Sequence, residues 1–256
     1  CPLGSEERTN PLEAMEAYKE SLNRDIAEFH NASLLEAAAQ GNLEAVRDAV
    51  RKGGDAKQAR DADGTNALVA CISKEFDNGV MRYLVEEARA DVSAADKYGF
   101  DALTTAAHFG VLVAVRYLVE EAKADAHAKT PLVNAAQNYR LDIVKYLVEK
   151  AQVDVSRRDD EGYTALDRAV SYVHLRDLKL IKYLVDVAGS PLDDHLFEMA
   201  EDIRDERRDV VMFIAEAHRR RKVTKIVLPR DCKPLWMLHK DIISAVREEI
   251  HSWYLG

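Results

Sequence analysis

One eight-residue pattern recurs along the chain and constrains its fold more than any other feature. Strong copies occupy residues 81–88, 115–122, 144–151 and 181–188, and weaker ones occupy 46–50 and 211–215. Each copy places apolar residues at positions i, i+3, i+4 and usually i+7, which form one stripe of an amphipathic helix. A single short helix cannot bury such a stripe. Six copies at a period of about 33 residues therefore predict a stacked array in which neighbouring helices bury one another.

Composition and charge narrow the class of protein. The chain has 256 residues, 47% of them hydrophobic, and a net charge of −9, which argues against a general nucleic-acid binder. Three scattered cysteines, Cys1, Cys71 and Cys232, indicate neither a disulfide framework nor a zinc site, so a cytoplasmic or nuclear setting is expected. The sequence has no apolar run of membrane-spanning length and no signal-peptide pattern, so no membrane partner is expected.

Turn signals lie between the recurring helices. Residues 61–68, 96–103 and 159–166 each begin with Asp, have Gly three residues later and end in Ala-Leu, while 130–132 reads Thr-Pro-Leu. Ala-Asp or Val-Asp pairs follow several of the helices, at 90–91, 124–125 and 153–154. The glycine suits a turn with positive φ, the residue in the threonine position is expected to cap the next helix, and alanines allow paired helices to approach closely.

Together these elements resemble the ankyrin-repeat family over about residues 33–218. The resemblance implies an all-α ankyrin-repeat solenoid of five to six stacked helix-turn-helix units. Residues 1–10 are interpreted as a purification-tag scar and flexible N-terminus, 11–32 as an N-terminal capping helix, and 219–256 as a C-terminal basic segment and capping helix. A Ser-x-x-Glu pattern at Ser33 predicts the start of a separate helix, and residues 223–228 are expected to form a short strand or an extended linker.

The chain departs from the family pattern in two ways. The histidine that follows the Thr-Pro-Leu position is replaced throughout, by Val69, Thr104, Val133 and Asp167, which predicts a divergent array. The fourth repeat also lacks most of its hairpin near residues 126–129. This shortening is either a true deletion or a gap in the recorded sequence.

No pattern in the chain indicates catalysis. The sequence contains no glycine-rich phosphate loop, H-E-x-x-H, C-x-x-C or G-x-S-x-G motif, and no two of its eight histidines have metal-ligand spacing. We therefore expect a protein that is not an enzyme, with no catalytic, cofactor-binding or metal-binding residues. The aromatic residues at one position of the second helices are expected to form a packed spine: Tyr83, Tyr117, Tyr146, Tyr183 and Phe213.

The remaining functional candidates lie on the surface. In ankyrin proteins, partners usually bind the concave face formed by hairpin tips and first-helix ends, so the resemblance implies a protein or peptide ligand there. The candidate partner-binding residues are Phe76, Tyr98, Phe100, Asp101, His108, Phe109, Tyr139, Arg140, Tyr163 and Tyr172. Aromatic residues gathered where the fold should be solvated favour recognition of another polypeptide. The leading hypothesis is thus a protein-interaction adaptor or scaffold.

An alternative places the function in the C-terminal segment. Residues 219–222 read Arg-Arg-Arg-Lys and lie within an acidic protein, followed by an amphipathic stretch at 233–254 that contains Trp236 and Trp253. This segment could present a docking helix to an effector such as a ubiquitin-ligase subunit, resembling faintly the C-terminal boxes of some ankyrin adaptors. Its basic cluster could instead contact nucleic acid.

Overall fold

The computed structural model describes residues 11–73, 76–128, 130–172, 178–202 and 207–227 of the chain. Within these ranges the regular elements are all helices, and the only extended pairing is an isolated bridge between Arg158 and Thr164. The all-α prediction is confirmed. The chain divides into two compact units, residues 1–172 and 173–256. No helix among the described residues is both long and apolar enough to cross a membrane.

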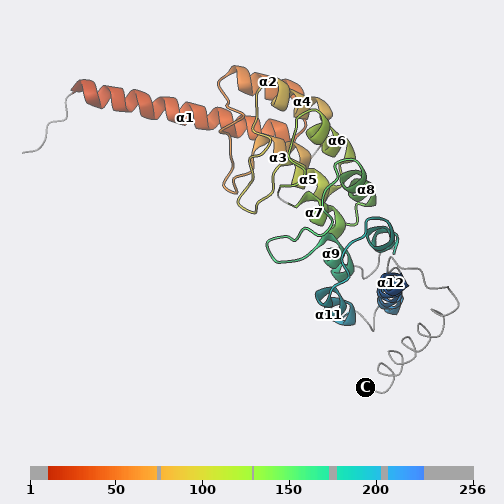
Figure 1. The fold of residues 1–256 in the computed structure, drawn as a ribbon. Helices are drawn as coiled ribbons and strands as arrows, with labels where there is room; N and C mark the ends of the chain where they lie inside the picture. The colour runs from red at the N-terminus through yellow and green to blue at the C-terminus, as the bar shows by residue number, and fades with distance from the viewer. Residues whose placement is uncertain (1–10, 74–75, 129, 173–177, 203–206, 228–256) are drawn as a thin grey trace, which may run out of the picture. The chain divides into compact units, whose positions relative to one another are not determined.

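The first unit consists of consecutive helical pairs. Its helices are α1 (Pro11–Ala39), α2 (Leu43–Arg51), α3 (Ala67–Ser73), α4 (Asn78–Glu86), α5 (Ala102–Phe109), α6 (Leu112–Glu120), α7 (Pro131–Gln137), α8 (Leu141–Glu149) and α9 (Ala165–Ser171). The first helices α3, α5, α7 and α9 pack one on the next, and the second helices α2, α4, α6 and α8 form a parallel row behind them (Figure 1). Hairpin loops project from the side of the first helices (Figure 1).

The core of this unit lies between the two rows. Leu68, Leu103 and Leu166 from first helices are almost fully buried, as are Leu118 and Leu147 from second helices. Fully buried alanines on α5 and α7 separate these leucines, and their small side chains let the helix backbones approach. The apolar residues of the recurring pattern therefore lie where the helical spacing predicted.

Polar side chains fix where most first helices begin. Asn66 accepts a hydrogen bond from the Val69 amide at 2.9 Å, and Asp101 accepts one from the Thr104 amide at 2.8 Å. These bonds satisfy amides that have no partner within the helix itself. Thr130 was expected to act in the same way and does not, because its backbone is left-handed (φ 53°) and its side chain makes no capping bond. Residues 130–132 match the family's Thr-Pro-Leu sequence best, yet of the first helices α3, α5, α7 and α9 theirs is the one that begins without a side-chain cap.

The second helices end in a left-handed residue. Arg89, Lys123 and Gln152 have φ values of 56°, 58° and 55°, whereas Gly189 supplies the same conformation with φ 73° at the corresponding place. The turn lets the next amide return to the helix, as Ala90 N does to Leu84 O at 2.8 Å. Residues with a Cβ atom are strained in this region of φ and ψ, so three of these repeats close at an energetic cost.

The predicted aromatic spine holds in part, because Tyr83 and Phe213 are only half-buried. Tyr117, Tyr146 and Tyr183 are buried, and cationic side chains lie over successive rings in the first unit. The guanidinium carbon of Arg82 is 4.5 Å from the centre of the Tyr117 ring, and that of Arg116 is 5.7 Å from the centre of the Tyr146 ring. Each cation belongs to the second helix of one repeat and each ring to the second helix of the next repeat. These contacts therefore join consecutive repeats.

The N-terminal segment differs from the prediction. Residues 11–32 were expected to cap the repeats and a new helix to begin at Ser33, but α1 is one continuous helix from Pro11 to Ala39. Only its last turns pack against the repeats, where Leu34 and Ala38 are fully buried. The apolar side chains between Leu12 and Phe29 are exposed, and contact with the first repeat begins near Asn31, whose side chain accepts a hydrogen bond from the Asp55 amide at 2.8 Å.

The second unit contains α10 (Lys179–Lys182), the π-helical turn η1 (Tyr183–Val187), α11 (Asp194–Asp202) and α12 (Arg208–Val227). Leu184, Leu196, Val210 and Ile214 are fully buried. Residues 223–227 are helical, so the expected strand or linker there is wrong. The predicted tag scar at 1–10 and the predicted helix at 233–254 lie outside the described residues.

Candidate interaction surface

Three hairpin turns of the first unit share one construction. In each, an aspartate side chain (Asp61, Asp96 or Asp159) accepts hydrogen bonds from the backbone amides two and four residues later, at distances between 2.8 and 3.1 Å. A glycine with positive φ then completes the turn, as Gly99 does with φ 83°. The sequence thus builds rigid turns that carry the residues at their tips.

Three of the predicted partner-binding residues are exposed. Tyr98 is 67% exposed at the tip of its hairpin, Phe109 is 45% exposed at the end of α5, and Tyr172 is 46% exposed just after α9. The Lys97 Nζ atom lies 5.0 Å from the centre of the Tyr98 ring, and the same amine pairs with Asp63 on the preceding hairpin. These contacts hold the Tyr98 tip beside its neighbour while leaving the ring open to solvent.

A chain of rings joins the second hairpin to α5. The ring centres of Phe100 and His108 are 5.5 Å apart, and those of His108 and Phe109 are 5.0 Å apart, both in edge-to-face geometry. Burial and the nearby positive charge of Arg140 lower the pKa of His108. The lowered pKa favours the neutral imidazole, and its Nδ1 atom lies 3.1 Å from Asn138 Nδ2. This half-buried cluster supports the exposed Phe109 ring.

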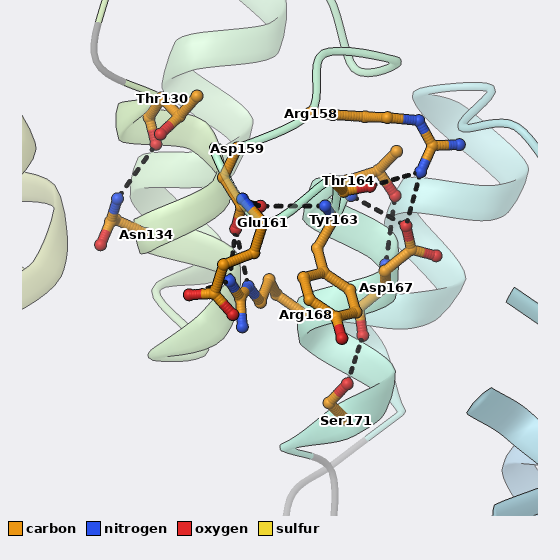
Figure 2. A network of polar contacts seen from close by, with 11 residues as sticks. Thr130, Asn134, Arg158, Asp159, Glu161, Tyr163, Thr164, Asp167, Arg168 and Ser171 are labelled. Carbon is orange, nitrogen blue, oxygen red and sulfur yellow. Dashed lines mark hydrogen bonds and ion pairs between the residues drawn. The ribbon is translucent and has the colours of Figure 1, made fainter. Parts of the chain in front are cut away.

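The hairpin turn at Asp159 is fixed by a charged network (Figure 2). Arg168 on α9 donates from Nε to Asp159 Oδ2 at 2.8 Å, and its Nη2 atom lies 3.1 Å from Glu161 Oε1. Its guanidinium carbon is also 4.3 Å from the centre of the Tyr163 ring. Burial lowers the pKa of Arg168, but the hydrogen bonds to Asp159 and Glu161 outweigh it and the pKa is raised, so the cation persists. Arg168 was not among the predicted site residues. It nevertheless fixes Asp159 and Glu161, which lie on the same hairpin as Tyr163.

Asp167 occupies the position of the family histidine in this repeat. It forms a reciprocal cap with Thr164, in which the Thr164 amide donates to Asp167 Oδ2 at 2.8 Å and the Asp167 amide donates to Thr164 Oγ1 at 3.2 Å. Arg158 also donates to this carboxylate, at 3.5 Å, and to the carbonyl of Gly162, at 2.6 Å (Figure 2). In this repeat the residue that replaces the family histidine therefore makes a polar network of its own.

Two predicted site residues have structural roles instead. Asp101 is only 6% exposed and caps α5, so it offers little surface to a partner. Tyr139 has a left-handed backbone (φ 58°) at the place where Gly110 turns the preceding repeat, and its hydroxyl donates to the carbonyl of Ala169. The tyrosine therefore links the turn after α7 to α9. Its place in the sequence, where the preceding repeat has Gly110, was a signal that this residue has a structural role.

The remaining predicted residues are intermediate in exposure: Phe76, Phe100, His108, Arg140 and Tyr163. Arg140 Nε donates to the carbonyl of His108 at 3.4 Å, which joins the turn before α8 to the end of α5. The structure therefore brings Phe100, His108, Phe109 and Arg140 together. Tyr163 lies on a separate hairpin, beyond the shortened fourth loop.

The C-terminal basic cluster is largely engaged with its own unit. Arg221 donates from Nη1 to the carbonyl of Ser190 at 2.5 Å and from Nη2 to the carbonyl of Val185. Arg219 pairs with Glu216 at 3.0 Å. The bonds of Arg221 fix the end of η1, and Arg220 pairs with Glu216 as Arg219 does, at 3.7 Å, so all three arginines of residues 219–222 have partners within their own unit. The tryptophans of the predicted docking helix lie outside the described residues.

The first unit consists of stacked helical pairs, with hairpin turns on one side in which a glycine follows an aspartate by three residues. This arrangement defines a helical-repeat solenoid. A family model described as ankyrin repeats (3 copies) matches residues 34–129 and 115–194. The chain belongs to the ankyrin-repeat family, whose repeats are generally protein–protein interaction modules and typically not enzymes. A search of curated proteins gives no significant match to the chain.

Proposed function

We propose that this protein is an adaptor or scaffold that binds a protein or peptide partner on the hairpin and first-helix face of its ankyrin repeats. The observation that carries the proposal is the exposure of Tyr98 and Phe109 on one side of the first unit. Both rings are mounted on ordered supports, the bonded hairpin pair and the Phe100–His108 contact. Rigid aromatic side chains contribute large contact area at a low cost in conformational entropy, which suits them to anchor a bound polypeptide.

The net negative charge of the chain favours a partner with cationic groups. Asp61 and Asp96 carry carboxyl groups at their hairpin turns, and Glu161 is exposed at the tip of the Asp159 hairpin, where it pairs with Arg168. Since the whole chain also carries a net charge of −9, a basic segment would be attracted toward this face.

The test is affinity capture with surface variants of the full chain. We expect the double variant Tyr98→Ala, Phe109→Ser to lose partners that the unmodified protein retains from native lysate. Val113→Ser on α6 is the matched control, because Val113 is an exposed apolar residue on a second helix. Tyr139 is unsuitable for this test, since its hydroxyl is bonded to Ala169 and its loss would disturb the repeats themselves.

The thermal unfolding midpoint of each variant shows whether the repeats remain folded. Retention of every partner by a folded Tyr98→Ala, Phe109→Ser protein would contradict the proposed face. A loss of partners that Val113→Ser reproduces would contradict it as well.

A further inference from the structure

Arg140, in the turn between α7 and α8, is held against the end of α5. Its Nε atom donates a hydrogen bond to the carbonyl of His108 at 3.4 Å. The guanidinium also lies across Gly110, which has a positive φ of 86°. A Cβ atom at Gly110 would stand only 2.7 Å from the Nε atom and 2.9 Å from the guanidinium carbon, so the glycine leaves the space in which this head group lies. Contacts from the preceding repeat therefore fix the place of the cation.

The charge of Arg140 is not paired with a carboxylate among the residues that the structure describes. The guanidinium is half-buried, and within those residues the bond from Nε to His108 is its one hydrogen bond. Lys97 on the second hairpin differs, because its amine pairs with Asp63. Both Nη atoms of Arg140 are therefore left to solvent or to a ligand. A guanidinium that is fixed in place with two unoccupied donors is well suited to bind a carboxylate.

An exposed apolar ring lies beside this cation. Phe109 precedes Gly110 in the chain, is 45% exposed, and contacts the ring of His108 edge to face, with 5.0 Å between the ring centres. Burial, and after it the positive charge of Arg140, lower the pKa of His108. The neutral imidazole therefore adds no charge of its own at neutral pH, while its pKa responds to the charge of Arg140. The local field at this end of α5 is positive.

We propose that Phe109 and Arg140 together form a subsite for an acidic motif of the partner, in which an apolar side chain lies next to a carboxylate. This inference rests on the proposed function, since it names the chemistry that the hairpin and first-helix face recognises. The apolar side chain packs on the Phe109 ring, and the two Nη atoms of Arg140 each donate to one oxygen of the carboxylate. The planar guanidinium matches a carboxylate in this bidentate arrangement.

The net charge of −9 acts over a different range from Arg140. It draws basic segments of a partner toward the protein, but charges more than about 8 Å apart are largely screened in physiological salt. The group that lies against Arg140 is therefore selected by the local charge, which is positive. A carboxylate fits better than a phosphate, because Arg140 supplies one positive charge and the acidic chain repels the second negative charge of a phosphate.

The experiment selects short peptides from a random phage-displayed library on the immobilised full-length chain. We expect the selected peptides to carry Asp or Glu adjacent to a large apolar residue or one residue away from it. Arg140→Gln should lose this acidic preference. Arg140→Lys, which keeps the charge without the planar fork, should retain the preference with a lower affinity. Arg89→Gln is the matched control, because it removes an exposed arginine just after α4, which is a second helix.

Affinities for one synthetic peptide from this selection test the contact itself. Replacing the acidic residue of the peptide by its amide should weaken binding to the unmodified protein about tenfold, because a charge-assisted pair is lost. The same replacement should cause no further loss with Arg140→Gln, since groups that contact each other are not additive. The thermal unfolding midpoint shows whether each variant is folded, and Arg140→Lys takes the place of Arg140→Gln in the cycle if the latter is not.

Three results would overturn the subsite. The losses could add in the cycle, or a folded Arg140→Gln protein could keep the acidic preference, and in both cases Arg140 does not contact the acidic residue. The third is tighter binding of the peptide with phosphoserine in place of its acidic residue, which would assign this surface to phosphopeptides.

The double variant Tyr98→Ala, Phe109→Ser separates this inference from the proposed function. Peptides that bind the folded double variant as tightly as the unmodified protein would contradict the proposed face and the subsite with it, as would a selection that enriches no peptide. Peptides that require the two rings but show no preference for an acidic residue would overturn the subsite alone and leave the proposed function in place.

Discussion

The hydroxyl of Tyr117 on α6 donates a hydrogen bond of 3.0 Å to a carboxylate oxygen of Glu86 on α4. The next repeat has the same arrangement, in which the Tyr146 hydroxyl donates to Glu120 at 2.9 Å. The glutamates are exposed, but each also accepts a bond from the following second helix. At Tyr117 and Tyr146 the spine is therefore joined by a hydrogen bond at the edge of the ring as well as by a cation over its face.

Removing these hydroxyl groups should weaken the array. We expect Tyr117→Phe or Tyr146→Phe to lower the free energy of unfolding by about 1 kcal/mol, because each variant loses a bond to a charged but solvated acceptor. Tyr83→Phe is the matched control, since the residue of α2 that corresponds to Glu86 is Arg51, which offers no acceptor. Urea denaturation measures the change, and equal losses in all three variants would show that the carboxylates contribute nothing.

The same two tyrosines should make the protein sensitive to alkali. Burial, followed by the bonds to Glu86 and Glu120, raises the pKa of Tyr117 and of Tyr146 to about 12 from an ordinary value of 10.0. A raised tyrosine pKa means that the folded state favours the neutral phenol. Its contribution is fully present below pH 10 and is lost as the pH rises through about 12.

We expect the denaturation midpoint to fall over this pH range by the equivalent of about 1 to 2 kcal/mol for each residue. The double variant Tyr117→Phe, Tyr146→Phe should show a flatter dependence, and tyrosinate absorbance reports the ionisation directly. An identical pH profile for the double variant and the unmodified protein would assign the alkaline transition to other groups.

Glycine at the strained helix ends should stabilise the protein. Arg89→Gly and Gln152→Gly are each expected to raise the free energy of unfolding by about 0.5 to 1 kcal/mol, because they remove the cost of a Cβ atom at positive φ. Lys150→Gly is the control two residues before Gln152, where the backbone is right-handed with φ −105°. That change should destabilise the protein by about 1 kcal/mol. Denaturant melts of the three variants distinguish the two effects by their sign.

The polar network at α9 should depend on the charge and the shape of Asp167. We expect Asp167→Ala to cost about 2 to 3 kcal/mol, because the buried Thr164 amide loses its acceptor and Arg158 loses one of its partners. Asp167→Asn keeps an acceptor oxygen and should cost about 1 kcal/mol. Asp160→Ala, an exposed change in the same hairpin, should fall within about 0.5 kcal/mol of the unmodified protein. Thermal and urea unfolding measure the three, and equal effects of Ala and Asn would contradict a capping role.

Much of the fold followed from periodicity alone. Val115 and Leu118 are three residues apart in the recurring pattern and both are fully buried, as are Val144 and Leu147 in the next copy. A spacing near 3.6 residues is a direct consequence of helix geometry, so it identifies the buried face without knowledge of tertiary contacts. The turn glycines were equally predictable, since few other residues tolerate positive φ.

Helix boundaries were less predictable. The Ser33-x-x-Glu36 pattern suggested a helix start, but the same four residues also fit within a helix, and no glycine or proline interrupts the chain between Leu12 and Gln40. Residues 223–227 show the same difficulty, because the β-branched residues that suggested a strand lie at the end of the helix α12. Local propensity is weak enough for the continuing helix to override it in both places.

The candidate surface was predictable in position but not in orientation. The motif placed Tyr98 and Phe109 at a tip and at a helix end, and both are exposed there. It placed Asp101 and Tyr139 on the same face, yet the bonds of those two residues to neighbouring backbone direct them into the structure. Which side chains a repeat retains for its own stability depends on partners in adjoining repeats, and a single-repeat alignment does not contain that information.

The short loop before α7 divides the hairpin turns into unequal groups. The turns at Asp61 and Asp96 are linked through Lys97 and Asp63, whereas the turn at Asp159 is ordered from α9 by Arg168. A ligand that contacts all three of these turns would pass the N-terminal end of α7, where the short loop provides no hairpin turn to contact it. If the proposed function holds, the contacts of such a ligand would fall into two clusters, separated by a stretch of the ligand that no hairpin contacts. The amino-acid sequence of that middle stretch would then be free to vary without a loss of affinity.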